Sequence, residues 1–165
     1  MSVTQNFDRL LHRLADSGLD FVIIGGYAAV THGSALVTRD LDICAVLTNE
    51  TLEKLRETLA DWHPMHRLTA NRLSFLNFPK FGTLQNLYLE TDFGVVDILT
   101  TVLGVGDFQR LKDAAEIFEI GGRRYQVISL EDLIVAKEAV GRPKDLLAAQ
   151  ELRAIAEKRR ESENK

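Results

Sequence analysis

Two aspartates, Asp40 and Asp42, flank a single leucine at the start of the apolar run LDICAVL. Alternate side chains of an extended strand point to the same face, so both carboxylates are expected on one face, opposite Leu41 and Ile43. Carboxylates this close repel each other, which raises the pKa of one of them unless a cation lies between them. Because Mg²⁺ and Mn²⁺ prefer carboxylate oxygens as ligands, the acidic pair predicts a divalent metal site.

A glycine pair, Gly25 and Gly26, follows the apolar run FVII that precedes the acidic pair. Glycines allow the backbone to approach a ligand closely, and a helix that begins after them presents unpaired N–H groups and a positive dipole end. Such groups bind phosphate oxygens. We therefore expect the glycine turn and an acid-bound metal to hold one polyphosphate from two sides.

A third acid, Asp97, lies in the apolar run GVVDILT. If this strand lies beside the strand of Asp40 and Asp42, its carboxylate joins the same site. In two-metal transfer reactions such a carboxylate helps to hold the second metal, which activates the attacking hydroxyl. The other interpretation is a solvent-facing strand residue, because the sequence alone does not give the strand neighbours.

The elements that must position these residues follow from the spacing of apolar residues and from turn signals. Short extended runs indicate an antiparallel meander over residues 72–100, and EIFEI and RRYQVI indicate a hairpin over residues 116–128. Ser129 and Asp132 fit a capping box at the start of a helix. Helices are predicted over residues 6–17, 27–31, 49–61, 130–140 and 144–158, and strands over residues 21–26, 41–47, 72–78, 83–90, 94–100, 116–120 and 123–128.

The composition predicts a single domain over residues 1–165, with a charged tail from about residue 156 that is expected to fray. A net charge of −4 gives no general basic surface, so a nucleic-acid partner would need a local basic patch. The absence of a membrane-length apolar stretch and of a signal-peptide pattern predicts a cytoplasmic protein with no membrane partner. The single cysteine, Cys44, is expected in the core.

An apolar strand ending in Gly-Gly, a short insert and then Asp-Leu-Asp-Ile resembles the signature of the DNA polymerase β-like nucleotidyltransferases. More narrowly, GG.A...HG....T.DLDI, VDIL and LI..K...GR.KDL resemble the small bacterial group that includes minimal nucleotidyltransferases and AbiEii-type toxins. The resemblance covers about residues 21–152. It implies an α+β nucleotidyltransferase fold, with a mixed sheet flanked by helices and with C-terminal helices. The implied activity is Mg²⁺-dependent (or Mn²⁺-dependent) transfer of a nucleoside monophosphate from an NTP such as ATP, with release of pyrophosphate.

Carried onto this chain residue by residue, the resemblance implies that Asp40, Asp42 and Asp97 are catalytic acids and metal ligands. The residues that it implies for nucleotide binding are Gly25, Gly26, Thr38, Arg39, Lys137 and Lys144. A solvated helix face or turn is the alternative for Lys137, Arg142 and Lys144, and a buried structural contact is the alternative for His32. Two positions depart from the pattern, with Leu36 where an arginine is common and Ala148 where a second acid is often seen.

The acceptor hydroxyl stays open at this stage, because RNA, a protein side chain and a small molecule all fit the implied reaction. The chain is short, so a partner protein or a second copy of the chain could complete the acceptor site. The resemblance implies a role in a toxin–antitoxin or defence pair. The alternative is a weakly active module of such a pair that binds a nucleotide or a partner.

Overall fold

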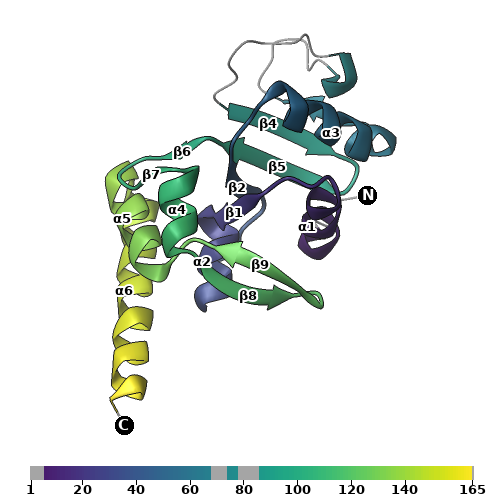
Figure 1. The fold of residues 1–165 in the computed structure, drawn as a ribbon. Helices are drawn as coiled ribbons and strands as arrows, with labels where there is room; N and C mark the ends of the chain where they lie inside the picture. Colours follow the sequence, from purple (N-terminus) through teal and green to yellow (C-terminus); the bar gives the residue numbers. More distant parts are fainter. Residues whose placement is uncertain (1–5, 68–73, 78–85, 165) are drawn as a thin grey trace.

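The computed structural model describes residues 6–67, 74–77 and 86–164. Its centre is a mixed sheet with the strand order β3-β4-β5-β2-β1-β9-β8, in which β1 pairs antiparallel with β2 while β2 and β5 run parallel (Figure 1). The strands are β1 (Phe21–Ile24), β2 (Leu41–Ala45), β3 (Met65–His66), β4 (Asn86–Thr91), β5 (Gly94–Leu99), β8 (Glu116–Ile120) and β9 (Arg123–Val127). A separate hairpin consists of β6 (Thr101–Val102) and β7 (Gly106–Asp107).

Helices flank this sheet, which confirms the α+β class expected from the sequence. They are α1 (Phe7–Asp16), α2 (Gly25–His32), α3 (Asn49–Leu59), α4 (Phe108–Ala114), α5 (Leu130–Val140) and α6 (Pro143–Glu163), with short 3-10 helices η1 (Ala60–Trp62) and η2 (Phe75–Asn77). Helix α2 packs against β1, β2 and α5, and α5 packs along α6. In Figure 1, α5 and α6 lie together at the left edge, and α6 extends away from the sheet. Among the described residues, no helix is both long and apolar enough to cross a membrane.

Alternating burial along the central strands separates a core face from a second face that is only half-buried. In β5, Val96 and Ile98 are fully buried, whereas Asp97 between them is not. In β4, Leu87 and Leu89 are buried in the same way, and Tyr88 between them shares the face of Asp97. The core face removes apolar area from water. The opposite face is left free to carry polar groups.

The junction between α5 and α6 is set by local sequence signals. The Ser129 hydroxyl accepts a hydrogen bond from the Asp132 amide, so the Ser129 half of the expected capping box is present. The Asp132 carboxylate accepts hydrogen bonds from Arg110. Gly141 ends α5 in the left-handed conformation, and Pro143 occupies the first turn of α6. This tight connection brings the end of α5 and the start of α6 to the same edge of the half-buried sheet face.

Several predicted boundaries differ from the structure. Helix α2 begins at Gly25 instead of residue 27, so both glycines belong to the helix. The predicted strand over residues 72–78 is wrong where the structure describes it, because η2 covers Phe75–Asn77 and only Ser74 forms a bridge, to Met65. Its remaining residues, and the start of the strand predicted from residue 83, lie outside the described part of the chain. The β6–β7 hairpin and α4 were not predicted, and α6 continues to Glu163 although its charged end was expected to fray.

Candidate functional site

Asp42 and Asp97 lie directly beside each other on neighbouring parallel strands, as the register of β2 and β5 pairs them. The strand adjacency on which the expected role of Asp97 depends is therefore present. Asp40 lies in a bend just before β2 and still acts on Asp42 through its charge. Burial, together with the negative charges of Asp97 and Asp40, raises the pKa of Asp42 to about 7. The ionised form of Asp42 is thus disfavoured first by burial and then by the neighbouring acids.

The glycine pair lets α2 begin in direct contact with the acidic strand. Gly25 has a φ of +68°, and a Cβ added there would lie 2.3 Å from Oδ2 of Asp42. A Cβ on Gly26 would lie 2.5 Å from Oγ1 of Thr38, whose hydroxyl donates to the Asp40 carbonyl at 3.3 Å. No side chain in the described part of the chain caps the N-terminus of α2. The first amides of α2 are therefore available to an anion beside Asp42.

The loop that precedes Asp40 and Asp42 is hydrogen-bonded to α6. The Glu151 carboxylate accepts hydrogen bonds from the Ser34 hydroxyl and, at 3.1 Å, from the Ala35 amide. The Leu36 amide in turn donates to Oγ of Ser34 at 3.1 Å. These contacts fix the backbone just before Thr38, so α6 helps to place the acidic pair.

Arg67, at the end of β3, pairs with the third acid. Its Nη2 lies 2.5 and 2.6 Å from the two carboxylate oxygens of Asp97, and the Arg67 side chain is 23% exposed. The sequence reasoning did not find Arg67, because nothing in the run WHPMHR marks it. Its position depends on β3 pairing with β4 far along the chain. Asp97 therefore already has a cationic partner within the protein.

A polar cavity of about 640 Å³ collects most of the residues that the sequence singled out. It is lined by Asp40, Asp42 and Asp97 together with Gly26, Thr38, Arg39, Lys137, Arg142 and Lys144. Leu36 and Ala148, the two departures from the family pattern, also line it. Lys137 lowers the pKa of Asp42, which places its charge within reach of the acid. The structure thus brings the predicted site residues to one cavity, except for Gly25, which does not line it.

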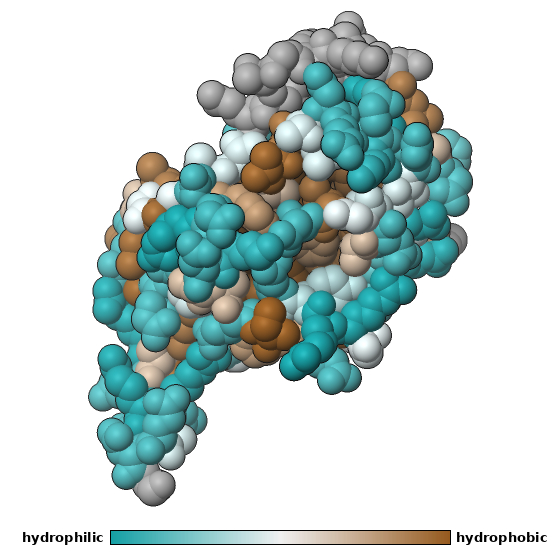
Figure 2. All heavy atoms as spheres, viewed as in Figure 1, coloured by the Kyte–Doolittle hydropathy of each residue, from teal (hydrophilic) through white to brown (hydrophobic). Residues whose placement is uncertain are grey.

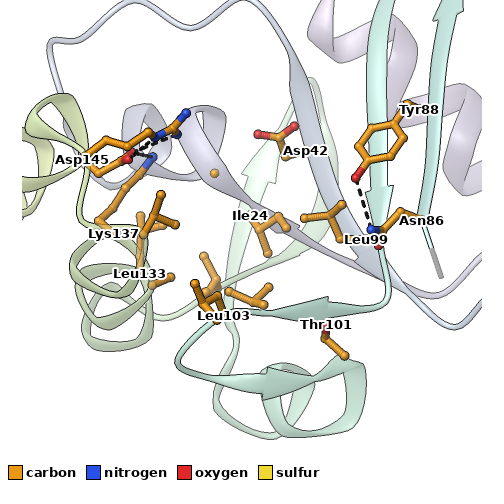
Figure 3. A pocket seen from close by; sticks show the side chains of 16 residues that line it. Ile24, Asp42, Asn86, Tyr88, Leu99, Thr101, Leu103, Leu133, Lys137 and Asp145 are labelled. Atoms are coloured by element: carbon orange, nitrogen blue, oxygen red, sulfur yellow. Dashed lines mark hydrogen bonds and ion pairs between the residues drawn. The ribbon is translucent and has the colours of Figure 1, made fainter. Parts of the chain in front are cut away.

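A second cavity of about 440 Å³ adjoins the first and shares Asp42, Lys137, Arg142 and Asp145 with it. Figure 3 shows Lys137 and Asp145 on one side of this cavity and Asn86 and Tyr88 on the other. The Asn86 amide donates to the Tyr88 hydroxyl at 3.2 Å. The apolar part of its wall comprises Ile24, Leu99, Val102, Leu103, Ile128, Leu133, Ala136 and Val140. We call it the apolar cavity, and the first one the polar cavity.

Apolar side chains at the mouth of the apolar cavity are left open to solvent. Leu103 is 65% exposed and Val140 is 46% exposed. In the view of Figure 2, apolar atoms gather along the left edge of the molecule, over α5 and the β6–β7 hairpin. Exposed apolar side chains next to a cavity are typical of a surface that a ligand covers.

His32 does not belong to this site. Its Nε2 lies 2.7 Å from the Ile128 carbonyl and its Nδ1 lies 2.9 Å from Nη2 of Arg159, and burial lowers its pKa. The buried structural contact considered from the sequence is therefore its role in the fold. Asp145 is a second site residue that the sequence reasoning did not find, although it lies inside the motif GR.KDL. The sequence signal that could have identified Asp145 is its position directly after Lys144.

The donor set of the site fits a divalent cation, although its geometry is incomplete. The carboxylate oxygens of Asp42 and Asp97 are hard ligands, and burial together with the neighbouring acids raises the pKa of Asp42. Within the described ranges, however, no group of three or more His, Cys, Asp or Glu side chains is arranged to hold a metal. Arg67 already pairs with Asp97, so a cation that binds this carboxylate must replace that contact.

Lys137→Met is expected to weaken binding of an Mg²⁺–NTP by about fivefold to tenfold, since one charge-assisted contact to phosphate is lost. Lys158→Met is the matched control, because Lys158 is exposed on α6 and lines neither of these two cavities. Isothermal titration calorimetry with a non-hydrolysable NTP analogue measures both variants. Equal affinities for the two variants would mean that Lys137 lies on a solvated helix face and does not contact the nucleotide.

The comparisons with known proteins agree with this geometry. The family described as nucleotidyl transferase of unknown function (DUF2204) matches residues 3–164. Among solved structures, the lincosamide antibiotic adenylyltransferase LnuA, in a lincomycin-bound form, has a TM-score of 0.60 at 17% identity and covers 90% of this chain and 95% of its own. The Thermotoga maritima protein TM1012 has a TM-score of 0.55 at 16% identity, and the match covers 96% of this chain and 99% of TM1012.

A third structure, the solution structure of the antibiotic-resistance factor ANT(2'')-Ia, has a TM-score of 0.51 at 15% identity and covers 96% of this chain and 95% of its own. None of the curated proteins is similar to the chain at the sequence level. At these identities the structural likeness establishes the fold, and the family match establishes the membership. The chain, an α+β protein of the nucleotidyltransferase fold, belongs to the DUF2204 family of nucleotidyl transferases.

Proposed function

We propose that this nucleotidyltransferase moves a nucleoside monophosphate from an NTP to an acceptor hydroxyl in a reaction that depends on Mg²⁺ or Mn²⁺. The observation that carries the proposal is the register of β2 and β5, which sets Asp42 beside Asp97. Gly25 brings the uncapped N-terminus of α2 against the same carboxylate. This arrangement supports binding of a polyphosphate between a carboxylate-bound cation and the helix amides.

The reaction is an in-line substitution at the α-phosphorus. The acceptor oxygen bonds to this phosphorus and its proton passes to water, while the bond to the bridging oxygen breaks and pyrophosphate leaves. A divalent cation bound at the acids supplies charge stabilisation for the reacting oxygens. The chain itself orients the polyphosphate through the first amides of α2 and through Lys137 and Arg142 in the polar cavity.

The acceptor in this proposal is a small hydroxyl-bearing molecule with an apolar body, bound in the apolar cavity. The size of about 440 Å³ falls in the range of small-molecule pockets. Among the described residues, the cations in its lining are Lys137 and Arg142, and both are shared with the polar cavity. An RNA acceptor would need further basic groups along its backbone path. Tyr88 and Asn86 supply the few polar contacts that orient a hydroxyl near Asp42.

Transfer of label from α-³²P-labelled NTPs tests this function. The protein is incubated with each NTP, Mg²⁺ and cell extract, and the products are separated into RNA, protein and small-molecule fractions. We expect Mg²⁺-dependent label in the small-molecule fraction, and none with the Asp40→Asn/Asp42→Asn double variant. Label confined to RNA or protein would overturn the acceptor class, whereas the absence of label with every NTP would overturn transfer itself.

The second candidate is a module of a toxin–antitoxin pair that binds a nucleotide and a partner protein, or a second copy of the chain, with little turnover. Leu36 favours it, because it lines the polar cavity where relatives of the minimal group commonly carry an arginine. Against it, Arg39, Lys137 and Arg142 line the same cavity and supply positive charge for a triphosphate. A result of nucleotide binding without transfer in the labelling experiment selects this candidate.

A further inference from the structure

We infer that Asp145 is a positioning residue, which holds Lys137 and Arg142 as a two-cation clamp for the polyphosphate. The inference rests on the proposed function, since it concerns how the same site binds its nucleotide. Lys137 comes from α5, and Arg142 lies just ahead of α6. Asp145 lies in the first turn of α6 and is 3% exposed. All three line both the polar and the apolar cavity.

The contacts of Asp145 tie both cations to one carboxylate. Nε of Arg142 donates to Oδ2 at 2.6 Å, and Nη2 donates to Oδ1 at 3.4 Å. Nζ of Lys137 lies 3.8 Å from Oδ1. The Arg142 guanidinium holds the pKa of Asp145 below its usual range, so this carboxylate is ionised at neutral pH. Figure 3 shows Asp145 and Lys137 together on the left, across from Asp42.

Positioning matters here because lysine and arginine side chains are long and have many rotamers. Fixing either side chain in one rotamer costs conformational entropy. When Asp145 holds both cations beside the cavity before the nucleotide binds, part of their conformational entropy is already lost in the free protein. Binding of the polyphosphate then loses less entropy for each charge-assisted contact that forms.

The electrostatic effect of Asp145 has the opposite sign. A carboxylate beside two phosphate-binding cations lowers the local positive potential, so its removal alone strengthens the attraction for an anion. A positioning role predicts weaker binding after the same removal. The direction of the change in affinity therefore separates the two roles.

Binding of Mg²⁺–tripolyphosphate, measured by isothermal titration calorimetry at constant ionic strength, is the test. We expect Asp145→Ala to weaken binding by about tenfold, since two tethers are lost. Asp145→Asn removes the same charge but keeps an oxygen that accepts a hydrogen bond from Arg142. We therefore expect it to weaken binding by only about threefold. A thermal melt of each variant reports whether the fold is retained, and the near-isosteric Asn variant keeps the test valid if the Ala variant unfolds.

Glu138→Ala is the matched control, because Glu138 on α5 pairs with Arg153 of α6 and contacts neither cation of the clamp. It removes one negative charge near the same helix pair, and its affinity for tripolyphosphate is expected to stay equal to that of the wild type or to rise slightly. Tighter or unchanged binding by both Asp145 variants would overturn the inference, and so would a wild type that does not bind tripolyphosphate. Binding that follows these expectations without any transfer of label would overturn only the proposed function.

Discussion

Asp42→Asn is expected to lower nucleotidyl transfer by about a thousandfold and to make the metal-free protein more stable. Loss of one carboxylate ligand removes about 4 kcal/mol of transition-state stabilisation, which corresponds to that factor in rate. Rates of label transfer from an α-³²P-labelled NTP at saturating Mg²⁺ measure the first effect. Asp61→Asn is the control, since Asp61 is an exposed acid that pairs only loosely with Arg13, at 3.5 Å.

The stabilising effect of the same substitution follows from the sign of the pKa shift. The pKa of Asp42 is raised from 3.8 to about 7 in the folded protein, so folding favours its protonated form. The resulting stability is fully present below pH 3.8 and is lost as the pH rises through about 7. An asparagine removes this loss, so we expect the variant to gain about 2 kcal/mol of unfolding free energy at pH 8 and almost nothing at pH 4.

Chemical denaturation at pH 4 and pH 8, in the presence of a chelator, measures this difference. Mg²⁺ is expected to stabilise the wild type at pH 8 and to leave the Asp42→Asn variant nearly unchanged. A variant that is less stable than the wild type at pH 8 would show that Asp42 is a structural residue whose charge the fold needs.

Gly25→Ala is expected to destabilise the protein by about 3 kcal/mol and to reduce transfer by about a hundredfold. Part of the cost is the left-handed backbone at a φ of +68°, which costs an alanine about 1 kcal/mol. The rest comes from the added methyl, which would lie 2.3 Å from Oδ2 of Asp42 and must push the carboxylate away from the N-terminus of α2. Displacement of the acid accounts for the loss of rate.

Gly122→Ala is the matched control for this prediction. Gly122 has a φ of +84° in the turn between β8 and β9, and a Cβ there would meet nothing within 4 Å. The Gly122→Ala variant is therefore expected to lose only the cost of a left-handed alanine, about 1 kcal/mol of unfolding free energy, and to keep full activity. Urea denaturation and the transfer assay on both variants separate the two costs. Equal losses of stability in the two variants would mean that Asp42 moves away from the added methyl at position 25 without an energetic cost.

The part of the site that depends on short-range patterns could be predicted from the sequence. Strand alternation placed Leu41 and Ile43 in the core and left Asp42 on the other face, and the glycine pair indicated a close approach of the backbone. Asp97 became a candidate because it interrupts an apolar strand. Its pairing with Asp42 required the parallel contact of β2 and β5, which no local pattern contains.

The remaining features depend on contacts between distant parts of the chain. Arg67 reaches Asp97 only because β3 pairs at the edge of the sheet, and Asp145 reaches Lys137 only across the turn between two helices. The β6–β7 hairpin is too short for its alternation to stand out, since each of its strands has 2 residues. Helix propensity gave no reason to include Gly25 in α2, because glycine disfavours helices and its place there is set by packing against β2.

The attachment of the loop before Asp40 to Glu151 has a consequence for how the protein matures. Ser34 and Glu151 are separated by 117 positions, and Glu151 belongs to α6, the last helix of the chain. During translation the chain emerges from its N-terminal end, so β1, α2 and β2 leave the ribosome long before their fastening point exists. The loop before Asp40 therefore lacks its two contacts with Glu151 in a nascent chain until α6 has been synthesised and has docked.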